Sequence, residues 1–152
     1  MTLEEIKTAH AKVAELIAKF EAQSRTLSFS AQTICLAPGE EYAGVILGKD
    51  GKQSHHLILL PGDKENINWN DANKWAVSIG GSLPTRREQS LLYSNLKEQF
   101  EGTYYWSSEQ HASSSGFAWF QGFRSGYQDY GNESSELCAR VVRRLTILRG
   151  EK

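Results

Sequence analysis

The spacing of the apolar residues changes along this chain, and that change constrains the fold more than any other feature of the sequence. Near the N-terminus, apolar residues recur every three or four positions, as they do along one face of an α-helix. Later, short apolar and aromatic runs alternate with Gly, Ser and Asn, which is typical of short strands joined by turns. Helices followed by short strands predict the α+β class.

Residues 1–26 are predicted to form an N-terminal amphipathic helix that begins at Leu3 and ends near Ser24. Thr2 and Glu5 have the spacing of a capping box. His10 lies on the apolar stripe and Leu16 lies beside it. The stripe itself consists of Leu3, Ile6, Val13, Ile17 and Phe20. Because coiled coils have the same spacing, we expect the helix either to dock on its own domain or to pair with copies of itself.

Residues 27–150 are predicted to form one domain. Strands Tyr42–Leu47 and His55–Leu60 should make a hairpin around Asp50-Gly51. Helices are expected at Asn68–Ile79 and from Thr85 onward, the second opening with a Thr85-Arg-Arg-Glu88 capping box. The other expected strands are Ser28–Leu36, Tyr104–Trp106, Gly116–Phe123 and Leu137–Leu145.

Four motifs of this domain occur in an order known from one family. They are Trp69-Asn-Asp-Ala72, Gly80-Gly81-Ser-Leu83-Pro84-Thr85-Arg-Arg-Glu88, Tyr105-Trp106-Ser107-Ser108 and Arg140-Val-Val-Arg143. In these motifs the chain resembles a bacterial and phage domain of unknown function that also forms the C-terminus of a Legionella collagen-like adhesin. The resemblance covers about residues 40–146. It implies a C-type-lectin-like domain, with two helices packed on a twisted antiparallel sheet and a loop-rich half that carries the binding residues.

Trp69-Asn70-Asp71 also resembles the Trp-Asn-Asp motif of calcium-dependent lectins. Here the motif precedes the first helix of the domain, whereas the lectin motif lies late in the chain. Calcium needs six to eight oxygen ligands, and the late region has no Glu-Pro-Asn sequence that could help to supply them. We therefore predict neither a metal site nor a cofactor.

Composition argues against two classes of partner. The net charge of -1 gives no broad basic face for nucleic acid. Arg140, Arg143 and Arg144 are expected to be structural and to pair with carboxylates, and the alternative is an anion-binding patch joined by Arg124. No apolar run approaches the roughly 18 residues of a membrane span, so no membrane association is expected.

The N-terminus and the cysteines bear on the compartment. The first residues are acidic and lack the apolar core of a secretory signal, so we expect a cytoplasmic protein, which leaves open a place in a phage particle. Cys35 and Cys138 are expected to be buried, reduced thiols, and a disulfide between them is the alternative.

No catalytic set stands out in the sequence. None of the histidines lies in a nucleophile or metal motif, and His55-His56 should point to opposite faces of a strand. The serines lack a nucleophile elbow, and the glycines lack a phosphate-loop pattern. We therefore predict that the protein is not an enzyme.

The segment Glu109–Asn132 is the predicted recognition surface, because it mixes rigid aromatic residues with small polar ones. Trp69, Trp75 and Trp106 are instead expected to pack in the core. The predicted contact residues are Glu109, His111, Trp119, Arg124, Tyr127, Asp129, Tyr130 and Asn132.

The expected function is that of a non-catalytic protein-binding module encoded by a phage or prophage. Two alternatives remain open. One is a small intracellular inhibitor of a host defence enzyme, which suits a compact single domain. The other is sequestration of a small anionic ligand such as a nucleotide, for which the arginines and aromatic residues would be suited.

Overall fold

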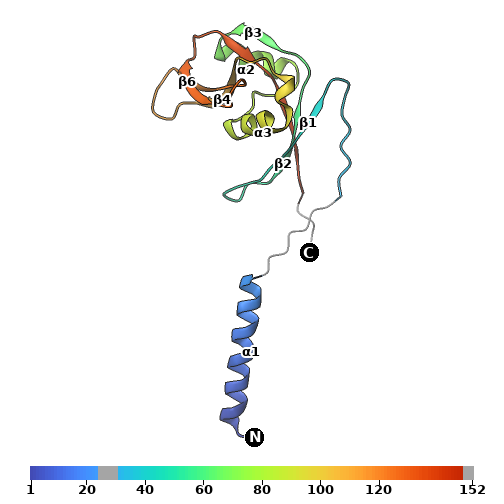
Figure 1. The fold of residues 1–152 in the computed structure, drawn as a ribbon, viewed down its shortest axis with the longest axis vertical. Helices are drawn as coiled ribbons and strands as arrows, with labels where there is room; N and C mark the ends of the chain where they lie inside the picture. The colour runs from blue at the N-terminus through green and yellow to red at the C-terminus, as the bar shows by residue number, and fades with distance from the viewer. Residues whose placement is uncertain (24–30, 149–152) are drawn as a thin grey trace. The chain divides into compact units, whose positions relative to one another are not determined.

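The computed structural model describes residues 1–23 and 31–148 and divides the chain into two units. The first unit holds helix α1 (Leu3–Gln23), which Figure 1 shows as one continuous helix. All of its residues are exposed. The predicted capping box is confirmed: the Thr2 backbone N–H donates to Glu5 Oε2 at 2.6 Å, and the Glu5 N–H donates to Thr2 Oγ1 at 3.2 Å. The helix therefore begins where its sequence predicts.

The second unit spans Thr33–Leu148 and contains two sheets. The first sheet has the order β1-β2-β8 and is antiparallel throughout. The second has the order β3-β7-β4-β5-β6 and is antiparallel except between β4 and β7. The strands are β1 (Glu41–Ile46), β2 (His55–Leu59), β3 (Lys64–Ile67), β4 (Tyr104–Gln110), β5 (Phe117–Gly122), β6 (Gln128–Asn132), β7 (Leu137–Ala139) and β8 (Val142–Thr146).

Two helices of this unit begin at side-chain caps. Asn68 Oδ1 accepts from the Asp71 N–H at 2.9 Å at the start of α2 (Trp69–Ser78). Thr85 and Glu88 form the predicted capping box of α3 (Arg86–Leu96), which a short 3-10 helix, η1 (Lys97–Gln99), follows. Each cap satisfies backbone N–H groups that would otherwise lack a partner in the helix.

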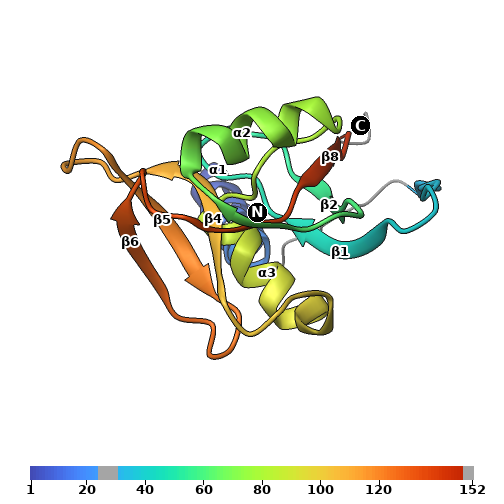
Figure 2. The same ribbon diagram turned by 90° about the horizontal axis from the view of Figure 1, so that it is seen from above.

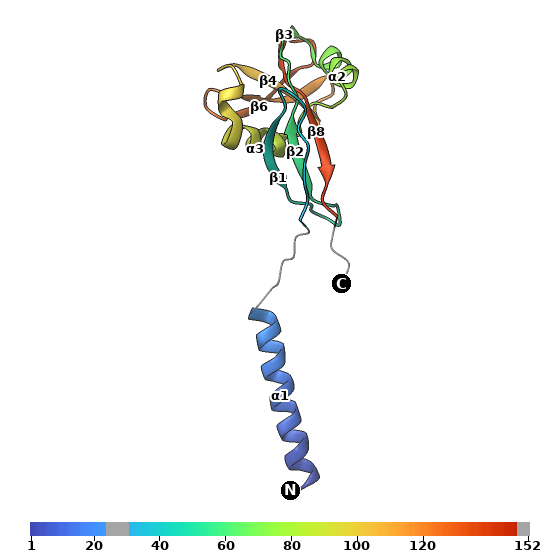
Figure 3. The same ribbon diagram turned by 90° about the vertical axis from the view of Figure 1, so that its right-hand side faces the viewer.

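The two helices cover opposite faces of the central strand β4, as Figures 2 and 3 show. Successive residues of a strand point to opposite faces. Tyr105 accordingly packs with Leu92 and Leu96 of α3, whereas Trp106 packs with Ala72 and Ala76 of α2. The core therefore has two parts, one on each side of β4.

The structure confirms the α+β class and the packing role of three tryptophans. Trp106 is completely buried, and its indole N–H donates to the Ile67 carbonyl at 2.9 Å. The Trp69 indole N–H donates to the Ser107 carbonyl at 2.8 Å. Trp69 and Trp75 both pack against the part of the core below α2.

Two strand predictions were wrong. In the predicted strand Ser28–Leu36, residues 31–36 form no strand, and residues 28–30 lie outside the described part of the chain. The prediction of a buried thiol at Cys35 was consequently wrong as well, because Cys35 is exposed. A strand needs a neighbour to accept its hydrogen bonds, and the pattern of one segment does not show whether a neighbour exists.

The second wrong prediction is the continuous strand Leu137–Leu145. The chain instead leaves the second sheet after Ala139 and enters the first sheet at Val142. Arg140 lies at this crossing with only 8% of its surface exposed, and its guanidinium donates to the carbonyls of Leu60 and Gln99. The sequence pattern also missed the short strands β3 and β6.

The structural role predicted for the neighbouring arginines is confirmed for two of them. Arg143 donates to both carboxylate oxygens of Glu40 at 2.8 and 2.7 Å, and these hydrogen bonds lower the pKa of Glu40 to about 2. Arg144 donates to Glu88 at 2.6 and 2.8 Å. Arg140 differs, because its hydrogen bonds go to backbone carbonyls rather than to a carboxylate.

Candidate functional site

Strands β4, β5 and β6 of the second sheet carry most of the predicted contact residues. Trp119 of β5 stands opposite Tyr130 of β6, and Phe120 stands opposite Asp129. Because side chains alternate along a strand, Trp119 and Tyr130 share one face of the sheet, whereas Asp129 belongs to the other. The predicted contact residues are thereby divided between two faces.

An aromatic cluster of His111, Phe117, Trp119 and Tyr130 lies on the first of these faces. The His111 ring is 5.5 Å from Trp119 and 4.1 Å from Tyr130, measured between centroids. Trp119 and Tyr130 meet edge to face at 5.2 Å, and Phe117 lies 6.2 Å from Tyr130. Tyr130 is 42% exposed. The cluster thus presents a pre-packed aromatic surface whose outer member is accessible.

The β4–β5 loop fixes one member of this cluster. His111 Nδ1 accepts the Ser114 backbone N–H at 3.0 Å, and the His111 N–H donates to the Phe117 carbonyl at 2.8 Å. These bonds orient the imidazole before any ligand arrives. A side chain already held in place loses little conformational freedom on binding.

Arg86, at the start of α3, connects the helix to the aromatic cluster. Its guanidinium carbon lies 3.5 Å from the centroid of the Trp119 ring, and Nε donates to Gln128 Oε1 at 3.2 Å. The Arg86 backbone N–H donates to Glu109 Oε2 at 2.6 Å, so a predicted contact residue in fact caps α3. Arg86 is not among the residues predicted from the sequence, since nothing in the spacing of Arg86 and Trp119 shows that they meet.

Beside Arg86 lies a cleft of about 540 Å³ between the two sheets and α3, which we call the basic cleft. Glu88 and Glu109 are held by Arg144 and by the α3 backbone respectively. The cleft therefore has an excess of positive charge. Its charged and titratable lining residues are Lys52, His55, Arg86, Arg87, Glu88, Glu109 and Arg144.

Glu88 organises the inner wall of the basic cleft. It is 1% exposed and accepts from Arg144, from His55 Nε2 at 2.8 Å and from the Thr85 N–H at 2.8 Å. Burial on its own would raise the pKa of Glu88, but the hydrogen bonds and positive charge of Arg144 lower it below the ordinary value. The carboxylate is therefore stabilised in its charged form and joins α3 to β2 and β8.

Tyr127 and Asp129 lie on the opposite face from the aromatic cluster. The Tyr127 hydroxyl donates to Asp129 Oδ2 at 2.5 Å, which lowers the pKa of Asp129 and raises that of Tyr127. Phe120 and Tyr104 meet edge to face at 5.2 Å on this same side. Tyr127, 53% exposed, is accessible but separate from Tyr130.

Arg124 lies before the start of β6, and Asn132 lies at its end. Arg124 belongs to the turn between β5 and β6, where its carbonyl accepts from Lys97 Nζ at 3.2 Å. Asn132 Oδ1 accepts from the Ser134 N–H and hydroxyl at 2.9 and 2.8 Å, so it holds a turn. The eight predicted contact residues therefore do not form one surface.

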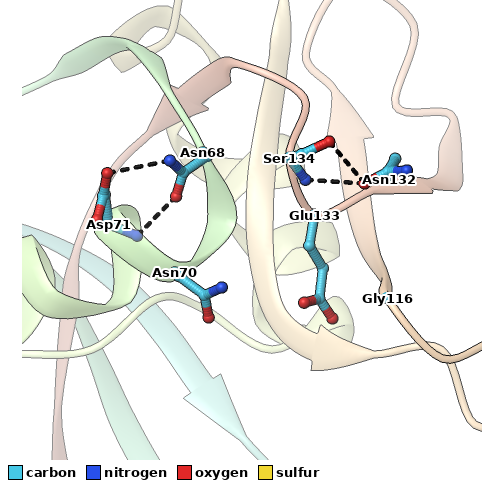
Figure 4. Close-up of a pocket in the computed structure, with 7 residues that line it drawn as sticks. All are labelled: Asn68, Asn70, Asp71, Gly116, Asn132, Glu133 and Ser134. Carbon is cyan, nitrogen blue, oxygen red and sulfur yellow. Dashed lines mark hydrogen bonds between the residues drawn. The ribbon is translucent and has the colours of Figure 1, made fainter.

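Asn132 also lines a second, polar pocket of about 480 Å³, together with Asn68, Asn70, Asp71, Gly116, Glu133 and Ser134 (Figure 4). The Trp69-Asn70-Asp71 segment thus reaches residues of the late region that are distant in sequence. The pocket has only two carboxylates, Asp71 and Glu133, and Glu133 Oε1 already accepts from Gln110 at 2.8 Å.

Among residues 1–23 and 31–148, no group of three or more His, Cys, Asp or Glu side chains is arranged to hold a metal ion. No helix in the same ranges is long and apolar enough to cross a membrane. Cys35 and Cys138 are both free thiols. Cys138 is only partly buried rather than buried as predicted, and this partial burial raises its pKa to about 11.

Comparison with known proteins adds no family. No model of a known protein family matches the chain, and a search of curated proteins finds no match either.

Proposed function

We propose that this protein is a non-catalytic binding module that recognises a partner protein through the aromatic cluster. The observation that supports this most directly is the packing of Trp119 against Arg86 and its aromatic neighbours, while Tyr130 remains 42% exposed. Tyr, Trp and Arg are the residues that most often dominate protein–protein binding energy. A surface held rigid by its own contacts also binds at a lower entropic cost.

We also propose that the domain has the C-type-lectin-like fold and belongs with the bacterial and phage domains that it resembles. The order of the four motifs supports this assignment. So does the placement of α2 and α3 on opposite sides of β4. The aromatic cluster lies next to the β4–β5 loop, in the part of the chain where that resemblance implies the binding residues.

The proposal predicts that Tyr130→Ala weakens partner binding at least about 30-fold, which corresponds to roughly 2 kcal/mol for a central aromatic contact. Tyr127→Ala is the matched control, because Tyr127 is 53% exposed on the opposite face. A partner would first be captured from host lysate with the full chain and identified by mass spectrometry. Its affinity for the purified variants would then be measured by biolayer interferometry.

Tyr127→Ala should bind the partner with an affinity within about threefold of that of the unmodified protein, a difference in binding free energy well under 1 kcal/mol. Equal losses in the two variants, or no loss with Tyr130→Ala, would exclude the aromatic cluster as the recognition surface. The identity of the partner then separates two roles. A host enzyme would favour inhibition, and a surface receptor would favour display on a phage or bacterial structure.

The basic cleft favours a second candidate, the binding of a small anion such as a nucleotide. Three cationic side chains, Lys52, Arg86 and Arg87, line the cleft without an ion pair to either of its carboxylates. Arginine recognises phosphate groups through paired hydrogen bonds. If this candidate holds, titration calorimetry should detect ATP binding, and Arg87→Gln should weaken that binding about tenfold. Arg124→Gln, at the β5–β6 turn, should not weaken ATP binding. Equal ATP affinity in the unmodified protein, Arg87→Gln and Arg124→Gln would count against the basic cleft as the binding site.

A further inference from the structure

The apolar stripe of α1 has the regular alternation of a coiled-coil seam. When His10 is counted, the stripe has six positions from Leu3 to Phe20, and they are separated by three, four, three, four and three residues. In heptad notation, Leu3, His10 and Ile17 occupy the a positions, and Ile6, Val13 and Phe20 occupy the d positions. A helix that packs on a globular core has a broader and less regular apolar face.

Within its own unit, this stripe is exposed. Leu3, Ile6, Val13, Leu16 and Ile17 are between 50% and 65% exposed, and Phe20 is 70% exposed. The helices α2 and α3 differ, because each buries apolar residues in the core. Most of the stability of a protein helix comes from packing of its apolar face rather than from helix propensity. A helix like α1 is therefore stabilised when another surface covers its stripe.

We infer that α1 pairs in parallel with the α1 helix of a second copy of the chain, forming a coiled coil. A second copy provides the same 3.5-residue repeat, which knobs-into-holes packing requires of both helices. Covering the exposed apolar side chains of two helices would bury on the order of 1,000 Å², the size that a specific interface needs. No other segment of the described chain presents a helix with this repeat.

The charges of α1 are compatible with this pairing. In a parallel pair, each g residue faces the e residue of the next heptad on the partner helix. The resulting contacts are Thr2 with Lys7, Ala9 with Ala14, and Leu16 with Glu21. None of these contacts joins like charges. Glu15 and Lys19 point away from the seam and pair within one helix at 3.0 Å.

His10 favours the parallel orientation. It is the one polar residue among the six seam positions. In a parallel pair the two His10 side chains meet at the same level, where one imidazole can donate a hydrogen bond to the other. In an antiparallel pair with the seams aligned, His10 would face Val13, which has no polar group. A polar residue at one a position thereby specifies the register at some cost in stability.

A pair would carry two copies of the second unit, Thr33–Leu148. If the proposed function holds, both aromatic clusters could engage one multivalent target, and the second contact would benefit from a high effective concentration. This consequence rests on the proposed function, whereas the pairing itself does not.

The pairing predicts the mass of the full chain in solution. Sedimentation equilibrium at about 50 µM should give twice the chain mass of 17.0 kDa, since a pair of this interface size associates in the micromolar range or tighter. Val13→Asp places a charge in the seam and should give the mass of one chain. Ala11→Asp is the matched control, because it places the same residue at an outward b position, and it should keep the double mass.

A mass of one chain for the unmodified protein would overturn the inference. So would a double mass that persists in Val13→Asp, since another surface would then hold the two copies together. The melting temperature of the Thr33–Leu148 unit should be the same in Val13→Asp and Ala11→Asp, which separates loss of pairing from loss of folding.

The orientation has its own test. Leu3→Cys in a Cys35→Ser background should give a disulfide between the two chains under mild oxidation, because parallel helices bring their N-termini together. An antiparallel pair would separate the introduced thiols by about 30 Å, the length of a 20-residue helix. A double mass without this cross-link would overturn the parallel arrangement.

Discussion

Replacing Trp106 by Ala is expected to lower the free energy of unfolding of the Thr33–Leu148 unit by about 4 kcal/mol, which is within the usual range for a buried tryptophan. Trp106 is completely buried against Ala72, Ala76 and Leu83, on the α2 side of β4. Its removal would leave a cavity there and would also leave the Ile67 carbonyl without its 2.9 Å hydrogen bond. Denaturant titration followed by circular dichroism measures the change.

Trp119→Ala is the matched control for this prediction. Trp119 is only partly buried and contacts Arg86 and the aromatic cluster, outside the core. Its replacement should cost less than about 2 kcal/mol, since partly exposed sites lose less transfer free energy and leave no closed cavity. Equal losses for the two variants would show that Trp119 is a core residue, and the aromatic cluster would then be scaffold.

Glu88→Gln is expected to destabilise the same domain by about 3 kcal/mol at neutral pH, because it leaves a partly buried arginine without its counter-charge. Glutamine keeps the shape of the side chain and can still accept the Thr85 N–H. It cannot provide the negative charge that Arg144 binds through two hydrogen bonds. The helix cap should therefore persist while the link from α3 to β8 weakens.

This effect should depend on pH in a defined direction. The pKa of Glu88 is lowered in the folded protein, so the charged carboxylate stabilises the fold above the ordinary carboxyl pKa of 4.5. That contribution is lost as the pH falls through the folded-state value. The difference in stability between the original protein and Glu88→Gln should thus be full at pH 7 and should shrink as the pH falls below 4.5.

Glu136→Gln is the control, because Glu136 is exposed in the same domain and its replacement should change stability by less than about 0.5 kcal/mol. Thermal melts from pH 3 to pH 7 would compare the three proteins. If the difference in melting temperature between Glu88→Gln and the original protein stayed constant over this pH range, the Glu88 charge would not be the cause of that difference.

Local features of the sequence predicted the helices well. The Thr2, Asn68 and Thr85 caps mark the starts of α1, α2 and α3, because a cap and its N–H partner lie within three residues of each other. The Asp50-Gly51 turn likewise predicted the β1–β2 hairpin, and both residues have positive φ there, at 56° and 79°. Such features can be predicted from the sequence because all their interacting groups are close in sequence.

Local sequence features could not predict which strands pair or which residues make up the candidate site. The predicted strand Ser28–Leu36 failed in its described part, and Leu137–Leu145 was divided between two sheets, because strand formation depends on distant hydrogen-bonding partners. The eight predicted contact residues were similarly divided. The register of β5 and β6 sends Trp119 and Tyr130 to one face and Asp129 to the other.

The sequence by itself thus determined the helix starts, the α+β class, the core tryptophans and the heptad stripe of α1. Only the tertiary structure brought Arg86 onto Trp119, Glu88 to Arg144, and Asn70 into one pocket with Glu133. The physical reason is the range of the interactions. Caps, turns and periodicity act over a few residues, whereas each of these encounters depends on how β-strands far apart in the chain pair and how helices pack on them.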